Sequence, residues 1–315
     1  MRGPVPRIPD DVLAVIREAF AAANRTTSER MCRLPNVWET SLDQAFIDTL
    51  VGRGGPIQVD SGWTVRIETH FLGGGRHWGP EWDFPRRRWE IADLGVLVMI
   101  REGFRLVLTK LALFQSKRLY PVDQPIDEIE IDHYISGFYR LYEGDAIAAD
   151  ASRPRLFTFD RASAYNMILA GDQQIDRIAG FERSNSVPVH YLLYNPAVVP
   201  WSQTHPLSSQ IALPAAIAVG CRVVPATDMR EMMVGAPAGS SPSYGQLIDD
   251  LPSPFRGSRT RAGRRIEDFI ERLVTCKEGY WAESREDNAL NYVFGGRGAP
   301  IAAAIGLTIS APDEG

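Results

Sequence analysis

The stretch that decides the fold is IADLGVLVMIREGFRLVLTKLALFQSKRL, at residues 91–119. Its first ten residues are almost continuously apolar, which is the composition of a strand that is covered on both faces. Residues 105–117 predict a returning strand, because their side chains fall into two alternating rows. A hairpin folded about residue 104 would place Asp93 opposite Gln115, since the two positions are equally far from 104. We therefore expect a central hairpin with polar residues at one end.

These polar residues are the chemically informative part of the hairpin. Lys117 projects from the same face as Gln115, two residues later, so that both converge with Asp93 at one end of an otherwise apolar pair of strands. Buried polar and charged side chains are costly unless they are paired or bind a metal. The chain also has only three lysines among its 34 basic residues. An aspartate, a glutamine and a lysine in this place therefore indicate a site.

The rest of the chain predicts an α/β fold. A helix should begin after Pro9 or Asp10, and Leu42, Phe46 and Leu50 recur at helical spacing within a second helix over about 37–51. Further strands are predicted at 63–71, 189–194 and 222–225, and further helices at about 127–142, 161–179 and 266–273.

Composition suggests how the chain is divided. Residues 235–243 contain only Gly, Ala, Pro and Ser, which favours an exposed loop or linker. We therefore expect an N-terminal helix in 1–30, a core in 31–234, and a linker with a C-terminal region of unknown role in 235–315.

Composition and missing motifs exclude several classes of protein. The chain has 315 residues, 44% of them hydrophobic and 23% charged, with a net charge of −5, so that nothing global indicates a polyanion partner. Three cysteines argue against a disulfide framework or a zinc site and favour a reducing, cytoplasmic location. No apolar run approaches the roughly 20 residues of a membrane helix, so we expect no membrane partner. Walker, HExxH, CxxC and GxSxG motifs are absent from the sequence.

The hairpin resembles the PD-(D/E)XK nuclease superfamily, in its Mrr-like variant in which Gln replaces the second acidic residue. The matching pieces are IADLGVLV at 91–98 and LALFQSKRL at 111–119, and the resemblance covers about residues 36–200. It implies a restriction-endonuclease-like core, in which a mixed central sheet is flanked by helices, with an added C-terminal region. Glu39 matches the acidic residue that the family carries on the helix before the sheet.

The resemblance implies a metal-dependent endonuclease that hydrolyses DNA phosphodiester bonds. Phosphodiester cleavage needs a divalent cation, and hard oxygen ligands suit Mg²⁺, with Mn²⁺ as the alternative. The expected ligands are Asp93, the amide oxygen of Gln115, the backbone carbonyl of Ser116, and Glu39. Lys117 would position the attacking water and stabilise charge on the phosphate. Defence against foreign DNA and a homodimer that cuts both strands follow from the resemblance alone.

Several alternatives stay open. Glu90 or Glu68 could replace Glu39 in the site, and Glu39 also fits the third position of a capping box that starts at Asn36. Asp93 could simply pair with Arg88 or Arg118. The protein could be an inactive nucleic-acid-binding protein on the same fold, or its substrate could be RNA. The arginines that we expect to contact nucleic acid are Arg86, Arg87, Arg88 and Arg118.

Overall fold

A computed structural model describes residues 7–71, 91–122, 155–205, 211–250, 263–282, 287–294 and 301–312. The helix predicted over 127–142 lies outside these residues.

Two N-terminal helices pack against each other and cover part of the sheet. Helix α1 (Asp10–Arg33) begins directly after Pro9, as predicted, and α2 (Glu39–Val51) follows after a short loop. Phe20 of α1 and Phe46 of α2 lie with their ring centroids 6.2 Å apart. Helix α2 buries the predicted stripe, which includes Leu42 and Leu50. This packing fixes the N-terminus of α2 close to the sheet.

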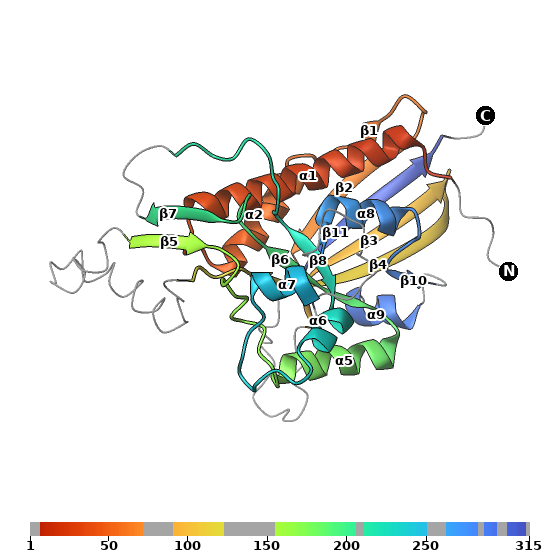
Figure 1. The fold of residues 1–315 in the computed structure, drawn as a ribbon. Helices are drawn as coiled ribbons and strands as arrows, with labels where there is room; N and C mark the ends of the chain where they lie inside the picture. The colour runs from red at the N-terminus through yellow and green to blue at the C-terminus, as the bar shows by residue number, and fades with distance from the viewer. Residues whose placement is uncertain are drawn as a thin grey trace, which may run out of the picture.

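The core of the molecule is a mixed sheet in the strand order β1-β2-β11-β3-β4-β6-β8-β9, with β10 also paired to β4 (Figure 1). Strands β11 and β3 run parallel, as do β4 and β6, and the other pairs are antiparallel. The fold is therefore mixed α/β, with a mixed central sheet flanked by helices, as expected. The bounds of the strands are β1 (Ile57–Gln58), β2 (Thr64–Phe71), β3 (Ala92–Glu102), β4 (Arg105–Arg118), β6 (Val189–Tyr194), β8 (Arg222–Pro225), β9 (Arg264–Arg265), β10 (Tyr280–Ala282) and β11 (Ile301–Ala311).

The β3–β4 hairpin has the predicted register, but it reaches that register through a bulge. The turn itself pairs Glu102 with Arg105, and a β-bulge beside it shifts the register by one residue. Beyond the bulge Leu94 pairs with Phe114, so that the predicted symmetry about residue 104 is confirmed there. A shift of one residue turns every side chain of a strand to the opposite face. The bulge therefore decides which side chains of the two strands share a face.

Helices cover both faces of this sheet. Figure 1 shows α1, α2 and α8 (Ile266–Val274) on one face, and α5 (Gln173–Asn185), α6 (Ala226–Met232) and α9 (Asn288–Phe294) on the other. Helix α7 (Tyr244–Asp250) and a separate pair of strands, β5 (Arg155–Phe159) and β7 (Trp201–His205), complete the described elements. None of the described helices is long and apolar enough to span a membrane.

The helix predicted over 161–179 is wrong in its first half. Residues 160–172 form turns and an isolated β-bridge at Ala164, and α5 begins only after Asp172, whose side chain accepts a hydrogen bond from the backbone N–H of Gln174. The preceding segment is held by tertiary contacts instead. The backbone N–H of Tyr165 donates to the carbonyl of Pro242, and the Tyr165 hydroxyl donates to Asn195 Oδ1 at 2.6 Å.

The C-terminal segment belongs to the sheet of the core. Strand β11 lies between β2 and β3, and β10 pairs with β4. The boundary that we expected after residue 234 therefore does not separate two units of the sheet. Strand β11 therefore completes the interior of the sheet.

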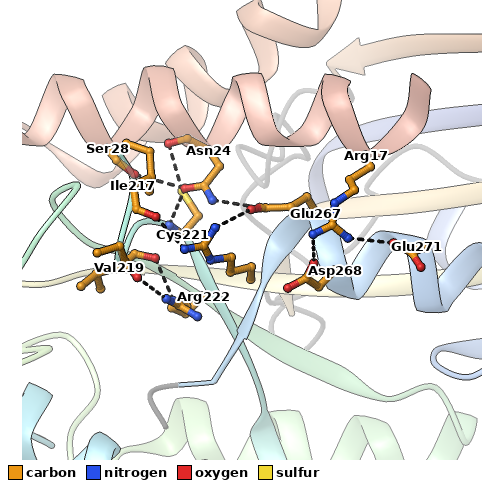
Figure 2. Close-up of polar contacts among 12 residues, drawn as sticks. Arg17, Asn24, Ser28, Ile217, Val219, Cys221, Arg222, Glu267, Asp268 and Glu271 are labelled. Carbon is orange, nitrogen blue, oxygen red and sulfur yellow. Dashed lines mark hydrogen bonds and ion pairs between the residues drawn. The ribbon is translucent and has the colours of Figure 1, made fainter. Parts of the chain in front are cut away.

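A buried polar network also joins α1 to the C-terminal segment (Figure 2). Asn24 Nδ2 donates to Glu267 Oε2 at 2.9 Å, while Asn24 Oδ1 accepts from the backbone N–H of Cys221 at 2.7 Å. On the more exposed side, Arg17 forms ion pairs with Asp268 at 2.6 Å and with Glu271 at 2.8 Å. Three segments that are far apart in the sequence thus share one set of hydrogen bonds.

Candidate active site

The expected site residues meet where β3 begins, β4 ends and α2 begins. The register of the hairpin brings Asp93 beside Gln115. Gln115 Nε2 donates a hydrogen bond to Asp93 Oδ2, and the backbone N–H of Ser116 donates to the same oxygen at 2.6 Å. The aspartate is therefore oriented by the strand that carries the glutamine.

Lys117 and Glu39 form an ion pair at the edge of this group. Lys117 Nζ lies 3.3 Å from Glu39 Oε1, and the exposed fractions of the two side chains are 6% and 21%. Glu39 Oε2 accepts a hydrogen bond from the backbone N–H of Arg118 at 3.1 Å. Burial lowers the pKa of Lys117, but the charges of Glu39, Asp93 and Asp43 outweigh burial and raise it overall. The lysine is therefore an ammonium at neutral pH.

The amide oxygen of Gln115 is the atom of this group that a ligand would satisfy. Gln115 Oε1 is buried and has no hydrogen-bond partner among the described residues. An unsatisfied buried oxygen costs about 1–3 kcal/mol, so such an atom calls for an explanation. It belongs to a side chain that is hydrogen-bonded to the Asp93 carboxylate. One carboxylate with an amide oxygen is a pair of hard donors that fits Mg²⁺ or Mn²⁺.

The acidic part of this donor set is small. Within the described residues, no group of three or more His, Cys, Asp or Glu side chains could hold a metal ion. A cation here would thus depend on neutral oxygen donors and on waters, in addition to Asp93. Mg²⁺ commonly keeps several waters and takes only one or two protein carboxylates.

Asp43 belongs to the same cluster and was missed by the sequence reasoning. Its Oδ1 accepts hydrogen bonds from Ser116 Oγ at 2.5 Å and from the Tyr194 hydroxyl at 2.6 Å. Burial raises the pKa of Asp43 to about 7, against the lowering effect of these two hydrogen bonds and of the Lys117 charge. A signal was present in the sequence, because Asp43 follows Glu39 by four residues and so shares a helix face with it.

The capping-box interpretation of Glu39 is wrong. Helix α2 begins at Glu39 itself, with Trp38 as the preceding cap residue, so that Asn36 lies outside the helix. The Glu39 carboxylate contacts Lys117 and the backbone of Arg118.

Arg118 does not have the role that we expected. Its side chain is 3% exposed, and its guanidinium donates hydrogen bonds to the carbonyls of Pro35 and Val37 and lies over the Tyr120 ring. The guanidinium therefore anchors the loop before α2. It is buried there and is not available for the predicted contact with nucleic acid. The same hydrogen bonds direct the guanidinium at this loop and not at Asp93, which was its alternative partner.

Glu68 is separated from the cluster. It lies on β2, pairs with Arg66 at 2.6 Å, and is divided from β3 by the whole of β11. Glu68 therefore does not complete the site. Glu90, Arg86, Arg87 and Arg88 lie outside the described residues.

Comparisons with known proteins give no relative for this chain. No protein-family model matches it, and searches of curated proteins and of solved structures find no match.

Proposed function

We propose that the protein is a Mg²⁺-dependent nuclease that hydrolyses DNA phosphodiester bonds on a restriction-endonuclease-like core. The observation that carries this proposal is the meeting of Asp93, Gln115 and Lys117 at one end of a central hairpin, with the Gln115 oxygen buried and unpartnered among the described residues. A structural cluster would satisfy that oxygen internally. A cation site would leave it for the ion.

The site residues would have different roles in phosphodiester hydrolysis. Asp93 and Gln115 would hold the cation, with the carbonyl of Ser116, and the Ser116 N–H keeps the Asp93 carboxylate in orientation. A bound Mg²⁺ supplies charge neutralisation at the phosphate and makes water more acidic. The other roles in the reaction would be carried by side chains of the protein.

Lys117 would face the phosphate as a charged ammonium. Its position is fixed by the ion pair with Glu39, which costs little freedom because both groups are largely enclosed. A positioned ammonium stabilises the negative charge that develops on the phosphate oxygens as water attacks. Glu39 would hold this lysine and accept a hydrogen bond from water near it.

The glutamine sets the strength of cation binding. Gln115 supplies a neutral oxygen where a glutamate would supply a charge, so that Asp93 is the main charged ligand. Fewer charged ligands give weaker binding of a divalent cation. We therefore expect cleavage to need millimolar Mg²⁺ and to be supported at lower concentrations of Mn²⁺.

Cleavage of supercoiled plasmid tests the proposal. The wild type should nick plasmid with Mg²⁺ or Mn²⁺ and stop with EDTA, whereas Asp93→Ala and Lys117→Ala should each lose at least about 100-fold in rate. Asp48→Asn, an exposed change on α2, is the matched control and should cleave like the wild type. Nicking that survives in both site variants would mean contamination and would refute the assignment.

A substrate panel separates the remaining possibilities. Duplex DNA, single-stranded DNA and RNA should be compared at the same metal concentration. Exclusive cleavage of RNA would replace the DNA assignment by an RNase. Binding of DNA without cleavage of any substrate would indicate an inactive binding protein. We also propose, on the same basis, that the setting is defence against foreign DNA and that a homodimer cuts both strands.

A further inference from the structure

Ser116 lies between the two site residues of β4, and the alternation of side chains along a strand turns it to the opposite face from theirs. Its Oγ donates to Asp43 Oδ1 on α2 at 2.5 Å. The hydroxyl of Tyr194, the last residue of the neighbouring strand β6, donates to the same oxygen at 2.6 Å. Both donor side chains belong to fully buried residues. Hydrogen bonds to a carboxylate in such surroundings are among the strong ones.

These contacts hold Ser116 from two sides. The backbone N–H donates to Asp93 Oδ2 at 2.6 Å, and the hydroxyl binds Asp43. Gln115 and Lys117 flank this residue in the chain, so that they cannot move along the sheet without breaking one of the two bonds. The pair of bonds thus fixes the spacing of Gln115 and Lys117 relative to Asp93.

Asp43 also fixes the helix that carries Glu39. The two residues are four apart on α2, which places them one turn apart on the same face, about 6 Å along the axis. Anchoring Asp43 to β4 and β6 therefore sets the rotation of α2 about its axis. That rotation brings Glu39 within 3.3 Å of Lys117.

We propose that Asp43 is a positioning residue of the site, acting through the hydroxyls of Ser116 and Tyr194 to set the geometry of the cation ligands and of the Glu39–Lys117 pair. The inference rests on the proposed metal site, and it adds Asp43 and Tyr194, which lie outside the sequence motif, together with a role for the Ser116 hydroxyl. Asp43 itself touches neither substrate nor cation. Residues of this kind around metal ligands typically change metal affinity or activity 10–100-fold when they are removed.

Binding of Mn²⁺ to the full-length protein, followed by electron paramagnetic resonance without substrate, measures this role apart from catalysis. We expect Asp43→Ala and Ser116→Ala to weaken Mn²⁺ binding about 10-fold or more. Asp43→Asn keeps an oxygen that accepts from both hydroxyls and should restore most of the affinity. Tyr194→Phe removes one donor and should have a smaller effect. The matched control, Asp48→Asn on the same helix, should bind like the wild type.

The measurement is made well below the melting temperature of each variant, so that loss of stability alone does not change the affinity. If Asp43→Ala does not fold, Ser116→Ala and Tyr194→Phe carry the test. Folded Asp43→Ala and Ser116→Ala variants that bind Mn²⁺ within twofold of the wild type would overturn the inference. If the wild type binds Mn²⁺ but cleaves nothing, the nuclease proposal fails while the affinities still decide the role of Asp43. A wild type that binds no Mn²⁺ would overturn both proposals.

Discussion

His190 should make the stability of this protein fall in mild acid. The residue lies on β6, is 4% exposed, and is enclosed by Phe114 and Phe269, with ring centroids at 5.9 Å and 4.7 Å. Burial lowers the pKa of His190 to about 4, although the Glu278 charge and a backbone hydrogen bond at Leu113 act against this shift. The folded protein therefore keeps the imidazole neutral over a range in which the unfolded chain is protonated.

The sign and size of the effect follow from proton linkage. Above the unfolded pKa of about 6.5 the full stability is present, and it is lost as the pH falls towards the folded pKa. Each pH unit between the two values costs about 1.4 kcal/mol. Lowering the pH from 7 to 5 should therefore remove about 2 kcal/mol of the free energy of unfolding through His190 alone.

Urea denaturation at several pH values measures this loss. Carboxylates also titrate in this range, so the wild type must be compared with His190→Leu, which removes the imidazole and keeps an apolar side chain of similar size. The difference in the free energy of unfolding between the two proteins should shift by about 2 kcal/mol in favour of the variant between pH 7 and pH 5. Parallel curves for the two proteins would refute the reasoning.

Three further changes test other parts of the structure. Gln115→Glu adds a charged ligand and should lower the Mg²⁺ concentration for half-maximal cleavage several-fold, and an unchanged or higher requirement would argue against a ligand role. Asn24→Ala removes a buried hydrogen-bond donor from the Glu267 carboxylate and should lower the free energy of unfolding, measured by urea denaturation, by about 2–4 kcal/mol. Arg17→Ala, which removes exposed ion pairs, should lower it by less than about 1 kcal/mol. Equal effects of the two changes would contradict this expectation. Arg118→Ala should lower the stability of the protein and its rate of cleavage, because it removes the anchor of the loop before α2. Its affinity for DNA, measured by fluorescence anisotropy with Ca²⁺ in place of Mg²⁺, should stay within twofold of the wild type. A large loss of affinity would instead support a role of Arg118 in nucleic-acid binding.

The central hairpin could be predicted because its signals are local. The apolar run of β3, the alternation in β4 and the short turn between them lie within about thirty consecutive residues. Their register brings Asp93 to Gln115, and the strands at 189–194 and 222–225 have the predicted bounds. Patterns of this kind express the period of the strand itself, and they need no knowledge of distant partners.

Other features depend on residues that are far apart in the chain. The apolar segment near the C-terminus is too short to span a membrane, but nothing in its own pattern indicates that it would insert between β2 and β3 as strand β11. Arg118 carries the same charge as an arginine that binds phosphate, and only the carbonyls of Pro35 and Val37 around it show that it is an anchor. The side chain alone does not decide between the two roles.

The sequence by itself determined the hairpin, the α/β class and the approach of Asp93 to Gln115, because side-chain period and turn length are properties of neighbouring residues. Only the tertiary structure decided that Glu39 pairs with Lys117, that Asp43 meets Ser116 and Tyr194, and that the last strand completes the sheet. The physical reason is that these contacts join surfaces of separate elements, whose relative placement depends on the packing of the whole core and is not encoded in any one segment.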